Sequence, residues 1–227
     1  IIDFLPDATF VIDQHGRVIA WNKAIEEMTG ISAEYMLGKN NYEYSLPFYG
    51  ERRPTLIDLI TLQDSEIEQS YLTLHRDYKR ISAESFCPFI GPEGAYMYGT
   101  ASPLLDSNSK LVGAIESIRD VSSRRKTEAA LRQSEEKFYK AFHGSPIMMC
   151  LATLDEGIFI DVNEAFCRGS GYTRKEMIGK SSTELNFYAS PDTNRSYRKM
   201  LLEQGRIEHY PFSFCKKSGE IRDGLLW

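Results

Sequence analysis

The chain has 227 residues, of which 42% are hydrophobic and 26% charged, and its formal net charge is −5 at pH 7. This length has room for one large domain or two of roughly 100 residues, with enough apolar residues for a core in each. The acidic balance argues against nucleic acid as a partner, because phosphate binding needs clustered cations. No segment approaches the ~18 consecutive apolar residues of a membrane span, so we expect no membrane contact.

The chain ends and the cysteines indicate what kind of protein this is and in which compartment it lies. The chain begins at Ile1 and ends at Trp227 inside a predicted strand, which favours a fragment of a longer protein. The cysteines form no C-x-x-C pair and have no histidine at zinc-ligand spacing. We therefore predict no metal site and interpret the cysteines as buried free thiols of a cytoplasmic protein: Cys87, Cys150, Cys167 and Cys215.

The first elements are a predicted hairpin followed by short helices. Residues 8–12 are β-branched and apolar, residues 17–21 repeat this pattern, and Asp13 and Gly16 fit the turn between the strands. Asn22 suits a helix N-cap and Gly30 a left-handed helix end. A second short helix runs from about residue 32 to Gly38, which predicts an α+β domain.

Strands dominate the rest of the first half. Residues 54–62 have helical spacing, whereas the assignment of residues 65–79 stays open. Three antiparallel strands are predicted at residues 80–89, 95–105 and 111–121, separated by turns rich in Gly, Asn and Ser.

A helix from Ser122 or Ser123 to about residue 142 is predicted as the linker. Positions at alternating spacings of four and three form the seam of a short coiled coil. Two of these positions are polar and one is alanine, so the seam is weak, and two helix packings could exchange at low cost. We expect a homodimer through this helix and the domain surfaces, and an inert spacer is the alternative. The seam residues are Thr127, Leu131, Ser134, Phe138 and Ala141.

An internal repeat relates the two halves at a constant offset. The second copy has the hairpin, at residues 149–154 and 158–162, and two later strands, at residues 207–216 and 220–227, but no final strand. We therefore expect a truncated second copy with an exposed sheet edge. The matching pairs are Asn22 and Asn163, Ala24 and Ala165, Gly30 and Gly171, Met36 and Met177, Gly38 and Gly179, and Lys39 and Lys180.

This order of elements resembles the PAS fold. The segments 5–8, 13–16 and 21–24 resemble the opening of a PAS domain, and Asp120-Val121-Ser122 is similar to the signature that closes one. Residues 128–138 resemble the connector between successive PAS units. The resemblance implies two PAS folds, each a five-stranded antiparallel sheet with short helices on one face. It places the first at residues 1–122, the helical linker at 123–142, and the second, without its last strand, at 143–227.

The resemblance also implies a function. It indicates the sensory input region of a microbial multidomain signalling protein, with a sensor histidine kinase of a two-component phosphorelay as the first choice for the output in the same polypeptide. A diguanylate cyclase is the alternative output. Nucleotide-binding, cyclase and hydrolase motifs are missing from the sequence, so we expect a regulatory fragment and not an enzyme.

Candidate site residues come from the cavity that the resemblance places between sheet and helices. We expect hydroxyl and guanidinium groups there to contact a small ligand, including an anion. The alternatives are that the arginines bind loop carbonyls or Glu51, and that the domain pair is architectural, dimerising without a ligand. The candidates are Tyr42, Tyr49, Arg52, Arg53, Tyr96 and Tyr98. For signal relay into the linker we single out Asp120, Ser122, Leu131 and Phe138.

Flavin and haem are not expected. Residues 40–42 and 181–183 hold no cysteine where thiol–flavin chemistry would need one. Haem needs an axial histidine, and His75 and His209 are interpreted as surface residues of strands. In the second copy, the aromatic residues Phe159, Phe166, Phe212 and Phe214 are predicted to form the core.

Overall fold

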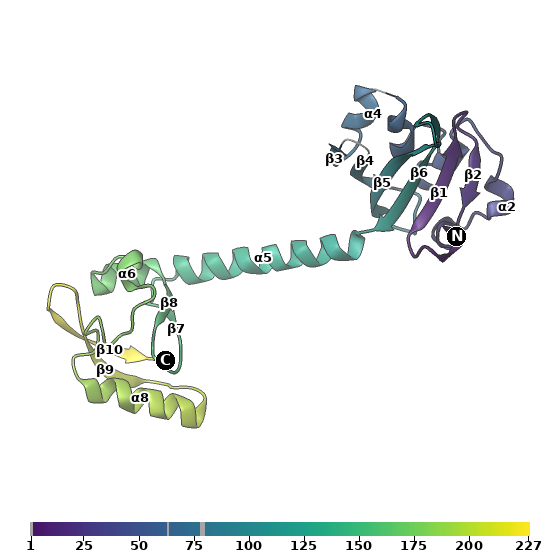
Figure 1. Ribbon diagram of the computed structural model, residues 1–227. Helices are drawn as coiled ribbons and strands as arrows, with labels where there is room; N and C mark the ends of the chain where they lie inside the picture. The colour runs from purple at the N-terminus through teal and green to yellow at the C-terminus, as the bar shows by residue number, and fades with distance from the viewer. Residues whose placement is uncertain (1, 63, 78–79) are drawn as a thin grey trace. The chain divides into compact units, whose positions relative to one another are not determined.

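A computed structural model of the chain describes residues 2–62, 64–77 and 80–227 (Figure 1). Two compact units divide between Ala129 and Ala130, inside the long helix α5 (Ser122–Gly144). The predicted linker, residues 123–142, lies within this helix. Each unit is described by itself below.

Unit 1 contains one antiparallel sheet whose described strands follow the order β2-β1-β6-β5-β4-β3. Five strands were expected, and that number is wrong for this unit. The sixth strand, β3, comes from residues 65–79, which were left unassigned. The strands are β1 (Ala8–Asp13), β2 (Val18–Trp21), β3 (Thr73–Asp77), β4 (Arg80–Cys87), β5 (Ala95–Leu105) and β6 (Leu111–Asp120).

Short helices of unit 1 pack against this sheet around a single hydrophobic core. Helix η3 contacts β4, β5 and β6 together, because its apolar side chains Leu56, Ile57 and Leu59 are buried. The helices are η1 (Ile2–Phe4), α1 (Lys23–Thr29), α2 (Ala33–Met36), η2 (Glu43–Ser45), α3 (Leu46–Tyr49), η3 (Leu56–Ile60) and α4 (Ser65–Gln69).

Unit 2 repeats the opening of unit 1 and then differs. Its described strands form two separate two-stranded antiparallel sheets, β7–β8 and β9–β10. In unit 1 the last strand, β6, lies between β1 and β5, and no described strand of unit 2 takes that place. The elements are β7 (Cys150–Ala152), β8 (Phe159–Val162), α6 (Glu164–Ser170), α7 (Arg174–Met177), α8 (Pro191–Gln204), β9 (Tyr210–Cys215) and β10 (Ile221–Leu226).

The core of unit 2 is aromatic. Phe159, Phe166 and Phe214 are buried as predicted, while Phe212 is partly buried and packs against them. Phe187 joins the cluster and stacks on Phe214, with ring centroids 5.4 Å apart. These rings fill the space between the two small sheets and the helices.

The repeated asparagines are N-caps in both units. The Asn22 Oδ1 accepts hydrogen bonds from the N–H of Ile25 and of Thr9, so one side chain joins α1 to β1. The Asn163 Oδ1 accepts in the same way from Phe166 and Met149. Both helices then end at a glycine in the left-handed region, as the sequence predicted: Gly30 and Gly171.

Candidate functional site

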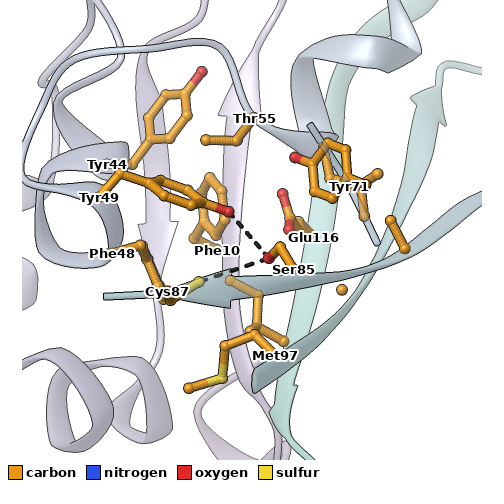
Figure 2. A pocket seen from close by; sticks show the side chains of 14 residues that line it. Phe10, Tyr44, Phe48, Tyr49, Thr55, Tyr71, Ser85, Cys87, Met97 and Glu116 are labelled. Carbon is orange, nitrogen blue, oxygen red and sulfur yellow. Dashed lines mark hydrogen bonds between the residues drawn. The ribbon is translucent and has the colours of Figure 1, made fainter. Parts of the chain in front are cut away.

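The candidate site is a cavity inside unit 1, between the sheet and the helices η2, α3 and η3. The register between neighbouring strands places the residues on the sheet side of the cavity next to one another. Phe10 of β1 pairs with Glu116 of β6, Glu116 pairs with Ala101 of β5, and Gly99 of β5 pairs with Ala83 of β4. Side chains alternate across a strand, so residues of this parity point to the helix-covered face. Figure 2 shows the side chains that line the cavity.

The cavity is small, and five of the 14 described residues that line it are aromatic. Its space for the centres of water molecules is about 20 Å³, and a single water needs roughly 10–15 Å³ by this measure. Rings from four elements line it: Phe10, Tyr44, Phe48, Tyr49 and Tyr71. The described residues of the lining include one carboxylate and no Lys, Arg or His.

That carboxylate is Glu116, on the central strand β6, with only 5% of its surface exposed. Its Oε2 accepts a hydrogen bond of 3.0 Å from the Ile57 N–H at the start of η3. No described residue donates a hydrogen bond to its Oε1. Burial raises the pKa of Glu116 to about 8, the charge of Asp58 adds to this, and the Ile57 hydrogen bond opposes it.

A separate row of hydroxyl and thiol groups also lines the cavity. The Tyr49 hydroxyl lies 3.1 Å from the Ser85 Oγ, which lies 3.7 Å from the Cys87 Sγ (Figure 2). Burial raises the pKa of Tyr49 and of Cys87, so both groups stay protonated near neutral pH. The Tyr71 hydroxyl completes the polar lining and has no hydrogen-bond partner among the described residues.

Asp58 forms a second buried acidic group behind the aromatic wall. Its Oδ1 accepts a hydrogen bond of 2.6 Å from the Tyr44 hydroxyl, and its Oδ2 accepts one of 2.7 Å from the Thr55 N–H. Burial is the largest influence on its pKa, which is raised despite these donors. One buried carboxyl group with a raised pKa therefore lies within η3 and the other accepts a hydrogen bond from it, and neither has an ion pair among the described residues.

The predicted ligand contacts fall on different sides of the domain. Tyr49 lines the cavity as expected. The placement of Tyr96 and Tyr98 there is wrong: they have the opposite parity to Met97 and Gly99 on β5 and lie on the outer face of the sheet. Tyr42 lines a separate surface groove near the β1–β2 turn.

The paired arginines make contacts of their own. Arg52 donates two hydrogen bonds to Glu43 Oε2, which holds the pKa of that carboxyl below its usual value. The Arg53 guanidinium lies over the Tyr49 ring, 4.6 Å from its centroid, and donates to the Ser70 Oγ. Neither arginine lines the cavity. Arg52 pairs with Glu43, and not with the loop carbonyls or Glu51 that were the alternative to a ligand.

The relay residues join the sheet to α5. Asp120 Oδ1 accepts a hydrogen bond from the Ser122 N–H, and the Ser122 Oγ accepts one of 2.8 Å from the Tyr96 N–H. Arg125, in the next turn, forms an ion pair with Glu84 and lies over the Tyr96 ring. Leu131 and Phe138 lie further along α5 and are 60% and 54% exposed.

His75 and His209 are both exposed, and neither lines the cavity. In the described part of the chain there is no cluster of three or more potential metal ligands. There is also no helix, in the ranges described, that is long and apolar enough to cross a membrane.

Comparison with known proteins identifies the family. A family profile described as PAS fold matches residues 2–126, and another described as PAS domain matches residues 146–225. Because the first covers more than half of the chain, the chain belongs to the PAS family. PAS domains are typical modules of sensory signalling proteins.

Individual relatives are distant. Phytochrome B of Arabidopsis thaliana is 22% identical over 227 residues, covering 96% of this chain but only 19% of its own length. The PAS domain of BvgS from Bordetella pertussis is 19% identical, covers 60% of this chain and 91% of its own, and has a TM-score of 0.37. A PAS domain from Colwellia psychrerythraea is 21% identical, covers 54% of this chain and 92% of its own, and has a TM-score of 0.38.

Sequence reasoning missed Glu116, Ser85, Cys87 and Tyr71. A signal for Glu116 was present: it lies at period two between Ala114 and Ile118 on a predicted strand, which puts a carboxylate on the buried face. Tyr71 carried no such signal, because its segment had no assigned structure. It reaches the cavity from the loop between α4 and β3.

Proposed function

We propose that the chain is the sensory input region of a larger signalling protein, in which the contents of the unit 1 cavity control helix α5. One observation carries this proposal: strand β6 holds Glu116 in the cavity and, at its end, Asp120, which caps the start of α5. A shift of β6 along its own axis therefore acts on both groups.

The contacts at the start of α5 are suited to such a relay. The Val121 N–H donates to the Tyr96 carbonyl and the Tyr96 N–H donates to the Ser122 Oγ, so the start of the helix is held at the start of β5. Because hydrogen bonds of this kind contribute only about 1 kcal/mol each, a modest change in the sheet is enough to shift the helix between two packings.

The proposed role extends to the rest of the protein. We infer that the chain itself is not an enzyme, that it lies in the cytoplasm, that it dimerises through α5, and that α5 and unit 2 pass the signal to an output domain in the same polypeptide. A sensor histidine kinase is our first choice for that output, on the resemblance of residues 128–138 to PAS connectors, and a diguanylate cyclase is the second.

Filling the cavity tests the relay. Ala83, which is buried in the lining of the cavity, is replaced by Leu to mimic an occupied state, and Ser82→Leu on the other face of β4 is the matched control. We expect Ala83→Leu, and not Ser82→Leu, to change amide hydrogen exchange at residues 119–129. If exchange changes only in β4, β5 and β6 while the first turns of α5 stay as they were, α5 is an inert spacer.

A purely architectural domain pair is the second candidate. It is favoured by the small volume of the cavity together with the exposed apolar seam of α5. Native mass spectrometry and an absorption spectrum of the purified chain separate the two. A retained small molecule supports the sensory role, whereas a dimer that binds no molecule in a broad metabolite screen supports the architectural one.

A further inference from the structure

The chemical groups that line the cavity indicate which class of ligand it binds. Glu116 is an acidic group nine-tenths buried, its Oε1 faces the cavity without a donor, and no described cation lies in the lining. A buried carboxyl group normally has its hydrogen bonds satisfied, whether it accepts them as a carboxylate or donates one as a carboxylic acid, so an oxygen without a partner among the described residues points to a ligand.

The absence of a side chain at Gly99 leaves space beside Glu116 Oε1. A Cβ atom at Gly99 would lie 2.9 Å from Glu116 Oε1 and 2.9 Å from Leu56 Cδ2. Any side chain at Gly99 would therefore push the carboxylate or η3 away. The hydroxyl oxygens of Tyr49, Ser85 and Tyr71 offer further acceptors around the same space (Figure 2).

The walls favour a cation. Aromatic faces attract positive charge through the ring quadrupole, and five of the 14 described lining residues are aromatic. The Arg53 guanidinium does not line the cavity and already lies over the Tyr49 ring and donates to Ser70. An anion would meet Glu116 and, behind the wall, Asp58, with no cation of the lining to compensate.

The volume of the cavity limits the size of the ligand. A space of about 20 Å³ for water centres holds one group of the size of water or ammonium. Ammonium has four N–H donors, whereas K⁺, of similar size, has none. We propose that the cavity of unit 1 binds a small monocation with N–H donors, with ammonium as the type, held by Glu116 and the surrounding hydroxyl groups.

Binding is coupled to release of a proton. With its pKa near 8, Glu116 is mostly protonated at pH 7 when the cavity is empty. On binding, the carboxyl O–H bond breaks, the proton goes to solvent, and the carboxylate accepts an N–H from the cation. Below about pH 8 the affinity should therefore rise roughly tenfold for each unit of pH. The other titratable groups that line this space are Tyr44, Tyr49, Tyr71 and Cys87, and Asp58 lies behind Tyr44 and accepts a hydrogen bond from its hydroxyl group.

The test titrates the full chain with ammonium chloride and follows the Glu116 carboxyl ¹³C signal by NMR at pH 7. Potassium chloride at the same ionic strength is the control salt, and Glu34→Gln, at an exposed carboxylate of α2, is the control variant. We expect ammonium, and not K⁺, to ionise Glu116, and the accompanying shifts of the lining amides to disappear in Glu116→Gln. Tyr71→Phe should weaken binding several-fold.

Equal effects of the two salts would overturn the inference, and so would ammonium shifts that persist in Glu116→Gln. The inference rests on the proposed sensory role, but the two fail differently. If ammonium has no effect while Ala83→Leu still alters α5, the ammonium site is wrong and the relay stands. If ammonium ionises Glu116 and α5 is unaffected by either change, the site stands and the relay is wrong.

Discussion

At the scale of single residues, Asn22 and Asn163 each tie three parts of a domain together. Besides capping α1, the Asn22 Nδ2 donates to the carbonyls of Ile2, Leu5 and Asp7, which fixes the N-terminal segment. The Asn163 Nδ2 donates to the carbonyls of Phe142 and Ile147, so the end of α5 is fixed to unit 2. In each domain, the side-chain amide of one asparagine thus fixes the position of the segment that precedes the first strand.

Replacing Asn22 by Ala should lower the free energy of unfolding of unit 1 by at least about 2 kcal/mol, because the N–H groups of Thr9 and Ile25 stay buried without acceptors. Chemical denaturation followed by the fluorescence of buried Trp21 measures this, in a Trp227→Phe background that removes the second tryptophan. The control is Asn108→Ala in the exposed β5–β6 turn, which should change stability by less than about 0.5 kcal/mol. Equal effects of the two would mean that the buried network adds nothing.

Glu116 should make the stability of unit 1 depend on pH. Its pKa is raised to about 8 in the folded domain and is about 4.3 when unfolded. Between these values the folded state binds more protons, so stability falls as pH rises, by up to about 1.4 kcal/mol per pH unit, and levels off above pH 8. Glu116→Gln remains neutral and should lack this slope.

The measurement is denaturation at several pH values between 5 and 9, comparing the two proteins with Trp21 as the reporter. Taking the difference between them cancels the titrating groups that do not interact with Glu116, which leaves Glu116 and its neighbour Asp58. A difference that is constant over this range would show that the pKa of Glu116 is not raised in the folded domain.

At the scale of elements, the packing of η3 on β5 depends on Gly99. Gly99→Ala should destabilise unit 1 by about 1–3 kcal/mol, because the new methyl group meets both Glu116 and Leu56 of η3. Gly144→Ala at the end of α5 meets no atom within 4 Å and is the control. Thermal denaturation compares them, and a Gly99→Ala protein as stable as the control would contradict the tight contact.

The start of α5 should be sensitive to one of two adjacent serines. Ser122→Ala removes the acceptor of the Tyr96 N–H, whereas Ser123 is exposed and its side chain has no hydrogen bond among the described residues. We expect faster amide exchange at Tyr96 in Ser122→Ala, by about five- to tenfold for a loss of about 1 kcal/mol. Ser123→Ala should leave this amide unchanged, and equal rates in both variants would remove Ser122 from the relay.

Strand positions were predicted well, whereas the face of β5 that lines the cavity was predicted wrongly. The runs of apolar residues predicted β1, β4, β5 and β6 to within a few residues, because their lengths and turns are local features. The face of β5 was assigned from the chemistry of Tyr96 and Tyr98, although the small residues Ala95, Gly99 and Ala101 share the other parity. Small side chains there leave space for the helices, so packing volume decides which face is inside.

At the scale of the whole molecule, the exposed seam of α5 predicts self-association. Leu131 and Phe138 are exposed and lie seven residues apart on this helix, which is the spacing of a coiled-coil seam. Replacing both by Ala should shift the chain from dimer to monomer in sedimentation velocity. The double variant Lys137→Ala and Lys140→Ala, at exposed positions of the same helix, is the control. An unchanged sedimentation coefficient for the Leu131 and Phe138 variant would exclude the coiled-coil seam.

The sequence by itself determined the repeat, the helix caps, the turns and the positions of most strands. Each of these depends on neighbouring residues: an Asn before a helix, a Gly at positive φ, or an alternating apolar run. Tertiary structure decided the sixth strand β3, the outward direction of Tyr96 and Tyr98, and the cavity around Glu116. These depend on pairing between distant segments, as when Ile57 of η3 meets Glu116 of β6. Burial of a carboxyl group follows from what packs around it, and that requires the assembled sheet.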